Sequence, residues 1–137
     1  MVGQPPINLL DAALEVNGGE ACLRIPKGDF SIPISANLLR SLQQRDVPRE
    51  FTVGIRPMDI SINSQVDKAA AQVRSDVFEP FGSLGLLSVK TQDMFLELLL
   101  SPELTVEPDY PLGIDFREDR LIFFDPVSEN NLLSNED

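Results

Sequence analysis

Short apolar segments, separated by Gly, Pro, Asn and Asp, recur along the chain at intervals of roughly 8–12 residues. This spacing is typical of an antiparallel β sandwich or barrel. The clearest hairpin joins Asn8–Val16 to Ala21–Ile25 through Asn17-Gly18-Gly19-Glu20, a turn sequence that tolerates a positive φ. The pattern therefore predicts a mainly β protein.

Further strands are expected where apolar residues alternate with polar ones or form short continuous runs. These segments are Phe30–Ile34, Glu50–Ile55, Asp59–Asn63, Ala69–Phe78, Leu84–Thr91, Met94–Leu100, Tyr110–Phe116 and Leu121–Phe124. Pro33 predicts that its strand lies at a sheet edge. Gln92-Asp93 occupies the place of a two-residue hairpin loop, and Arg117-Glu118-Asp119-Arg120 is interpreted as the polar tip of a hairpin between the last two strands.

One helix is expected, at Ser35–Arg45. Ser35 or Asn37 can cap its N-terminus, because a short polar side chain can accept a hydrogen bond from a free backbone N–H there. Leucines at positions 38, 39 and 42 lie on one face of the helix. The predicted fold class is therefore mainly β with one short helix.

The composition excludes several kinds of chemistry. The chain of 137 residues contains no His and no Trp, and its only cysteine is Cys22. Intrachain disulfides, cysteine-histidine zinc sites and histidine-based catalysis are therefore excluded. No Gly-Lys-Ser/Thr phosphate loop occurs, and Gly82-Ser83-Leu84-Gly85 is interpreted as a tight turn. Cys22 is interpreted as a small apolar residue, and we assign no catalytic residue.

The net charge of −11, with a pI near 4.3, would repel a phosphate backbone, so nucleic acid is not an expected partner. Residues 1–74 carry eight basic and eight acidic side chains, whereas 75–137 carry three and 14. A solvated surface is the favoured interpretation of the acidic half, and a dedicated acidic docking face is the alternative.

Four carboxylates in the acidic half could suggest a cation site, but they lack the spacing and the glycine of a helix-loop-helix calcium site. A solvated rim is expected instead for Asp109, Asp115, Glu118 and Asp119. The chain has neither a signal-peptide pattern at Met1 nor an apolar run long enough for a membrane span. A cytoplasmic location is therefore expected.

Three motifs have a structural interpretation of their own. Gly54–Ile60 reads as a strand that ends in a corner made rigid by Pro57, with a charge-assisted contact between Arg56 and Asp59. Glu79-Pro80-Phe81-Gly82-Ser83 reads as a bend between strands. Phe123-Phe124-Asp125-Pro126 reads as a strand end whose rings close a barrel mouth.

Together these motifs resemble the carboxy-terminal regulatory region of ATP-binding subunits of bacterial ABC importers, the maltose and sugar type with a transport-associated OB-like domain. The family corner Gly-Ile-Arg-Pro-Glu-Asp is matched at positions 54–59, except that Met58 replaces the glutamate. Phe78–Ser83 is similar to Val-Glu-Pro-Leu-Gly-Ser, and Phe123–Pro126 to Leu-Phe-Asp-Pro. Gly3–Asn8 resembles the junction Gly-Ser-Pro-Pro-Met-Asn, so the similarity runs from about Gly3 to Val127.

The resemblance implies an OB-like regulatory domain over 1–127, built of two small intertwined β subdomains at about 1–63 and 69–127. The remaining residues 128–137 are expected to form a flexible tail. The candidates for shaping the barrel and contacting partner chains are Gly54, Arg56, Pro57, Asp59, Glu79, Pro80, Gly82, Phe124 and Asp125.

The resemblance also implies a function without catalysis. The module would hold two ATPase subunits together as a homodimer, at the inner face of the membrane beside permease subunits, and could receive signals from a regulatory protein. ATP and Mg²⁺ would bind an upstream ATPase domain, which is missing from this sequence, so no cofactor is expected in this chain.

Two alternatives remain open. One is an OB-like domain that binds an oxyanion such as molybdate or sulfate through backbone amides and hydroxyls, although the net charge disfavours an anion. The other is an OB-fold nucleic-acid binder, which needs a basic groove with exposed aromatic residues. Basic residues are not concentrated in this sequence, so the second alternative ranks last.

Overall fold

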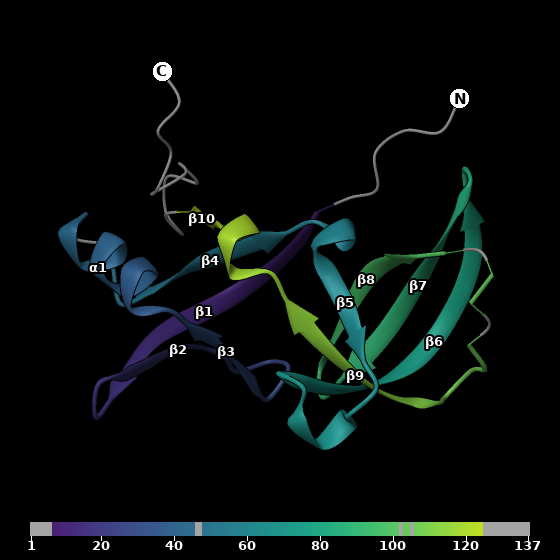
Figure 1. Ribbon diagram of the computed structural model, residues 1–137, viewed down its shortest axis with the longest axis horizontal. Helices are drawn as coiled ribbons and strands as arrows, with labels where there is room; N and C mark the ends of the chain where they lie inside the picture. The colour runs from purple at the N-terminus through teal and green to yellow at the C-terminus, as the bar shows by residue number, and fades with distance from the viewer. Residues whose placement is uncertain (1–6, 46–47, 102, 105, 125–137) are drawn as a thin grey trace.

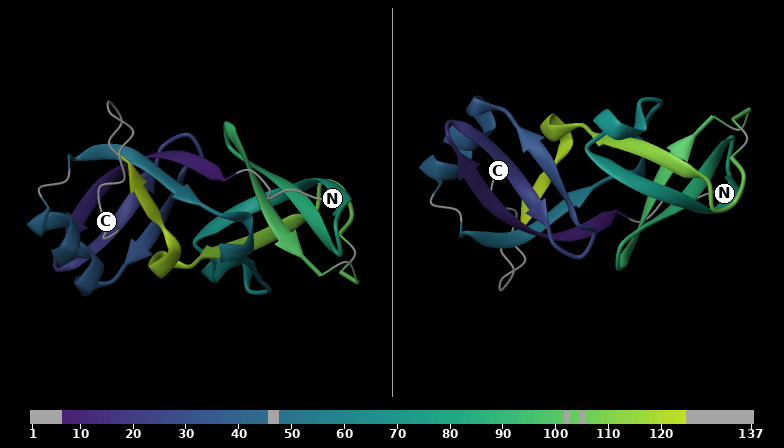
Figure 2. Two further views of the ribbon diagram at one scale, coloured as in Figure 1. Left: turned by 90° about the horizontal axis from the view of Figure 1, so that it is seen from above. Right: turned by 90° about the horizontal axis from the view of Figure 1, so that it is seen from below.

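The fold is mainly β, as predicted, in a computed structural model that describes residues 7–45, 48–101, 103–104 and 106–124. Within these ranges, two five-stranded antiparallel sheets lie side by side, and one helix, α1 (Ala36–Gln44), lies at the outer end of the first sheet (Figures 1 and 2). The strands are β1 (Asn8–Asn17), β2 (Glu20–Ile25), β3 (Phe30–Ile34), β4 (Glu50–Ile55), β5 (Ile60–Asn63), β6 (Ala71–Phe81), β7 (Leu84–Thr91), β8 (Met94–Leu100), β9 (Pro111–Phe116) and β10 (Ile122–Phe124).

The first sheet has the order β10-β4-β1-β2-β3. The predicted hairpin forms between β1 and β2, where Gly18 and Gly19 adopt φ values of 57° and 90° that a residue with a Cβ rarely takes. Pro33 lies on the edge strand β3, as predicted, so its missing N–H removes no hydrogen bond from an interior strand.

The second sheet has the order β5-β9-β6-β7-β8. Its two edge strands, β5 and β8, contact each other, so the sheet curls back on itself (Figure 1). Gln92-Asp93 forms the predicted two-residue loop between β7 and β8, and Gln92 adopts a positive φ of 42°. The predicted turn at Gly82-Ser83 joins β6 to β7.

Two crossovers link the sheets. The chain leaves β4 through the 3₁₀ turn η1 (Pro57–Asp59) and enters β5 in the second sheet, then returns from β9 through η3 (Glu118–Arg120) to β10 in the first sheet. The predicted hairpin at Arg117–Arg120 is therefore wrong, because β9 pairs with β5 and β6 whereas β10 pairs with β4. Strand β5 belongs to the second sheet, although its residues fall within the first subdomain, which was expected to end near residue 63.

A continuous core runs through both sheets, because each strand turns alternate apolar side chains inward. Fully buried side chains include Leu10, Leu23, Ile25, Ile32, Val53, Phe123, Leu87, Val89, Leu96, Leu98 and Ile114. The helix begins after Ser35, whose Oγ accepts a hydrogen bond from the N–H of Leu38, and it buries Leu42. No helix among the described residues has the length and apolar content to cross a membrane.

The sheets are joined by contacts as well as by the crossovers. The rings of Phe30 (β3) and Phe116 (β9) stack with centroids 5.5 Å apart. The hydroxyl of Thr91 donates to the carbonyl of Gly28 at 2.7 Å, and the N–H of Asp93 donates to the carbonyl of Lys27 at 2.9 Å. These contacts attach the β2–β3 turn to the end of β7.

Candidate partner-contact site

The predicted corner at Gly54–Asp59 is the first crossover between the sheets. Pro57 opens η1, where its fixed φ suits the turn and its missing N–H removes no bond. Pro57 and Asp59 are buried, whereas Arg56 and Met58 are exposed, Met58 by 53%. The corner therefore presents a basic and an apolar side chain outward from a rigid turn.

Arg56 and Asp59 do meet, but through the backbone. The N–H of Asp59 donates to the carbonyl of Arg56 at 2.9 Å, which closes the turn, and the carbonyl of Asp59 accepts from the N–H of Arg117 at 3.1 Å. The predicted charge-assisted contact is wrong, because among the described residues no ion pair joins these two side chains. The second bond instead ties the two crossovers together.

Gly54 and Phe124 come together at this corner. A Cβ on Gly54 would lie 2.8 Å from Cδ1 of Ile7 and 3.1 Å from Cε2 of Phe124, so the missing side chain leaves the space in which these two pack. Leu9, on β1, is paired with Gly54 on β4, and its side chain is 59% exposed. We call the exposed side chains of Leu9, Arg56 and Met58 the corner surface.

Sequence reasoning missed Asn8, a second buried polar residue beside the corner. Its side-chain amide donates to the carbonyls of Ile55 at 3.2 Å and Glu97 at 2.9 Å, and its Oδ1 accepts from the N–H of Glu97 at 2.8 Å. The carboxamide thus pairs with the edge of β8 as a neighbouring strand would. The available signal was a carboxamide at the first position of a strand whose alternate residues are buried.

Glu79, Pro80 and Gly82 lie elsewhere, at the end of the β6–β7 hairpin. Gly82 adopts a φ of 64° at the first position of the two-residue turn, as a type II′ hairpin requires. Nearby, Phe78 lies over Gly85, where a Cβ would approach its ring to 2.1 Å. The structure therefore separates these three candidates from the corner, and Asp125 lies outside the described residues.

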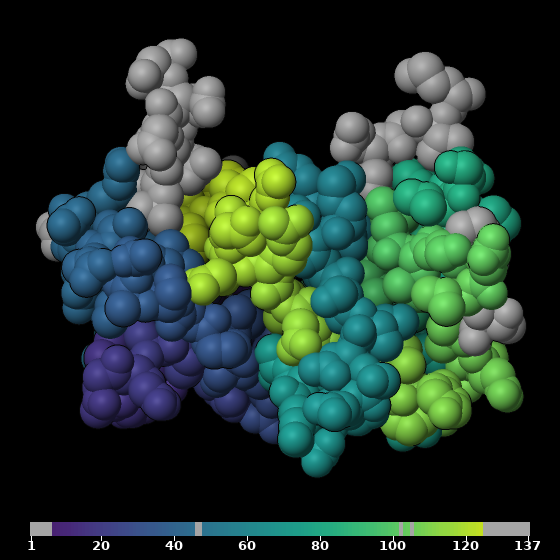
Figure 3. Space-filling model, viewed as in Figure 1, coloured from purple at the N-terminus to yellow at the C-terminus, as the bar shows by residue number. Residues whose placement is uncertain are grey.

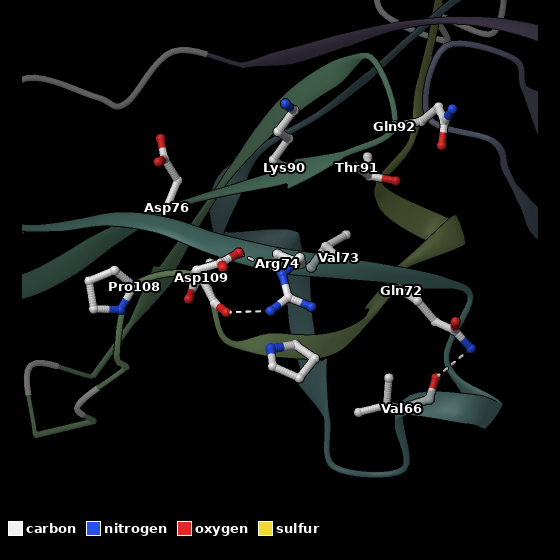
Figure 4. A pocket seen from close by; sticks show the side chains of 12 residues that line it. Val66, Gln72, Val73, Arg74, Asp76, Lys90, Thr91, Gln92, Pro108 and Asp109 are labelled. Carbon is white, nitrogen blue, oxygen red and sulfur yellow. Dashed lines mark hydrogen bonds and ion pairs between the residues drawn. The ribbon is translucent and has the colours of Figure 1, made fainter.

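A groove of about 700 Å³ crosses β6 and the end of β7 (Figure 4). It is lined by Val66, Gln72, Val73, Arg74, Ser75, Asp76, Lys90, Thr91, Gln92, Pro108, Asp109 and Pro111. Arg74 is held by Asp109, with Nε 2.6 Å from Oδ1 and one terminal nitrogen 2.7 Å from the carbonyl. The groove carries both signs of charge, because Lys90 and Asp76 also face it.

Ser75 attaches the segment 107–110, which forms one side of the groove, to β6. Its Oγ donates to the carbonyl of Glu107 and accepts from the N–H of Tyr110 at 2.8 Å. Its backbone N–H donates to the carbonyl of Tyr110 at 2.9 Å, and its carbonyl accepts from Asp109 at 2.8 Å. Between Ser75 and Phe78 the pairing of β6 with β7 slips at a bulge, so the attachment coincides with a bend in the strand.

We expect the carboxyl of Asp109 to titrate below the ordinary range of aspartate. A hydrogen bond from Arg74, assisted by its charge, lowers the pKa of Asp109. The pair therefore stabilises the fold above the ordinary aspartate pKa, and this contribution is lost as the pH falls through the lowered value. A carbon-detected NMR titration measures this pKa.

Arg74→Gln should return the pKa of Asp109 towards its ordinary value. The matched control, Arg24→Gln, removes the guanidinium that pairs with Asp29 and should leave Asp109 unchanged. An unaltered titration of Asp109 in the Arg74 variant would contradict the assignment.

The carboxylates considered as a cation site serve separate contacts. Asp115 accepts from the amide of Asn63 and the N–H of Ala70, and Glu118 accepts from the N–H of Ser35 at 2.8 Å. Asp119 pairs with an arginine of its own turn. Within the described ranges, no group of three or more acidic or cysteine side chains is arranged to hold a metal ion.

Comparison with known proteins bears on the first half of the chain. Residues 3–60 match the sequence model of the MalK OB fold domain. The matched stretch contains the first-sheet strands β1 to β4 and the whole corner. A search of curated proteins finds no match.

A solved structure shows the same fold over most of the chain. It is that of the cytoplasmic molybdate-binding protein ModG in a form with molybdate bound. The likeness has a TM-score of 0.64 at 11% sequence identity and covers 87% of this chain and 96% of that one. The part of the chain that the structure describes is thus mainly β, with two antiparallel sheets and one α-helix, and its first half matches an OB fold domain.

Proposed function

We propose that this chain is a non-catalytic regulatory and dimerisation module of an ABC-importer ATPase subunit, in uptake of a carbohydrate or related solute. The observation that carries the proposal is the match of residues 3–60 to the MalK OB fold domain, because the corner motif lies inside it. In this proposal, ATP and Mg²⁺ bind an ATPase domain upstream, and the module acts in the cytoplasm beside the membrane permease.

The corner surface is the place where we expect two copies to meet. Leu9 and Met58 are each more than half exposed, and both extend from backbone that is fixed by sheet pairing or by the Pro57 turn. Exposed apolar side chains on a rigid support suit an interface between copies. The near-neutral charge of residues 1–74 also favours self-association through this half over the acidic half.

Sedimentation velocity on the full chain tests this proposal. We expect a reversible dimer whose dissociation constant rises about tenfold or more in Met58→Asp, because an unpaired charge would be buried in the interface. Val16→Asp is the matched control, since Val16 is 47% exposed at the β1–β2 hairpin, away from the corner. A chain that stays monomeric at every concentration, or that binds ATP in calorimetry, would contradict the proposal.

Oxyanion binding is the second candidate, and the likeness to a molybdate-bound ModG structure favours it. The net charge of −11 opposes it, although backbone amides can bind an anion locally against the overall field. Calorimetry with molybdate and tungstate separates the two candidates. Saturable binding of either anion would support oxyanion binding. If neither anion gave a heat of binding, the dimerisation module would be the remaining candidate.

A further inference from the structure

Exposed apolar side chains gather at the end of the second sheet that lies away from α1. Four of the eight large apolar residues exposed in the described ranges are there. They belong to the end of the β6–β7 hairpin and to the segment between β8 and β9, which lie at the same end of the molecule (Figures 1 and 3). They are Val77, Leu84, Leu104 and Tyr110. We call residues 76–84, 103–104 and 106–110 the far end.

The far end also contains an open sheet edge. Strand β9 pairs with β6 only from Ala71 to Arg74, and Ser75 then takes the bonds from the 107–110 segment. Among the described residues, no strand pairs with this side of β6 from 76 to 81. An exposed edge of this kind offers N–H and C=O groups to an added strand.

The hairpin turn fixes which groups face that edge. In a two-residue turn the flanking residues Phe81 and Leu84 bond to each other, so the backbone groups of Phe78 and Pro80 point away from β7. Phe78 offers an N–H and a carbonyl, whereas Pro80 offers only a carbonyl. The edge is therefore short, and Pro80 limits how far a strand can pair along it.

The charge around this edge indicates which kind of segment would bind there. Exposed carboxylates lie close to the apolar residues along the chain, at Asp76, Glu79, Glu103 and Glu107. Lys and Arg are absent from 75–89 and from 91–116. A second copy would bring the same carboxylates together, whereas a basic segment would complement them.

We propose that the far end binds an extended segment of a partner protein in which apolar residues alternate with lysine or arginine. The segment adds a strand beside Phe78 on β6, its apolar side chains contact residues such as Val77, and its basic side chains meet the carboxylates. This surface is distinct from the corner surface, so the inference holds whether or not the chain forms a dimer there.

A peptide series tests the chemistry on the full chain. The probe is a fluorescently labelled Lys-Val-Lys-Val-Lys-Val-Lys peptide, measured by fluorescence anisotropy. We expect binding that weakens as salt is raised, and at least about tenfold weaker binding of the Glu-Val counterpart. Two further Lys-Val peptides carry N-methyl groups at alternate residues, one at the odd and one at the even positions. One of the two should bind at least about tenfold more weakly than the unmethylated peptide, because strand pairing needs the N–H groups on one side of the segment. Equal binding of all four peptides would overturn the proposal.

Variants and mapping locate the binding. Peptide binding should be abolished in the far-end variant, which combines Glu79→Lys, Glu103→Lys and Glu107→Lys. The matched control makes the same charge change at exposed positions of the first sheet, Glu15→Lys, Glu20→Lys and Glu50→Lys, and should retain most of the binding. NMR shifts of the unmodified chain should cluster at the far end, residues 76–84, 103–104 and 106–110. The inference would be overturned by NMR shifts elsewhere in the chain or by an equal loss of peptide binding in both variants. It would also be overturned by a concentration-dependent dimer that only the far-end variant abolishes.

Discussion

Phe123→Ala should lower the free energy of unfolding by about 3–5 kcal/mol, the cost typical of removing a fully buried phenylalanine. Phe123 is 1% exposed, and its ring packs against Phe51 with centroids 5.5 Å apart. It is the middle residue of β10, which has only three residues and pairs with β4. The variant therefore loses a core side chain and the anchor of the second crossover.

Urea unfolding followed by circular dichroism measures this loss. Phe95→Ala is the matched control, because Phe95 is 57% exposed on β8 and its truncation should change stability by about 0.5 kcal/mol or less. A loss below about 1 kcal/mol in Phe123→Ala would mean that β10 does not anchor the first sheet. A domain of this size has only about 5–15 kcal/mol of stability, so the expected loss brings the variant close to unfolding.

Asn8→Ala should lower the free energy of unfolding by about 2–3 kcal/mol, because it removes three hydrogen bonds and leaves buried backbone groups without partners. The amide joins the end of β4 in the first sheet to the middle of β8 in the second. Hydrogen exchange gives a second, local measure: the N–H of Glu97 should exchange faster in the variant.

The control for this prediction is Asn17→Ala, at the exposed end of β1. It removes the same side chain from a position without those bonds and should change stability by about 0.5 kcal/mol or less. Equal stability of the two variants, or unchanged exchange at Glu97, would show that the Asn8 amide does not join the sheets.

Local patterns predicted the strands better than their partners. Alternation and short apolar runs identified each strand of the described residues, because both signals appear within a single segment. They could not show that β5 pairs with β9 and β10 with β4, since pairing depends on segments far apart in the chain. The hairpin expected at Arg117–Arg120 failed for this reason, as its short polar turn crosses between sheets instead.

The role of the candidate residues in contacting partner chains stays a prediction, but the structure shows how several of them pack within the chain. The motifs placed Gly54 and Phe124 among the candidates, and the structure shows that they share one packing contact. Pro80 was expected at a bend, but β6 continues to Phe81, because a proline whose nitrogen faces an open edge interrupts no ladder bond. Asn8 was missed because a carboxamide that pairs with a distant strand edge looks like any polar residue in sequence.

The return of the chain to the first sheet has a consequence for synthesis on the ribosome. Strand β4 ends at Ile55, but its outer neighbour β10 begins at Ile122, so the amino-terminal half emerges long before its last strand exists. During that interval the β10 side of β4 stays open, and Phe51 lacks the ring that packs against it. We therefore expect the nascent first half to stay unfinished, and open to chaperones, until the residues of β10 have been translated.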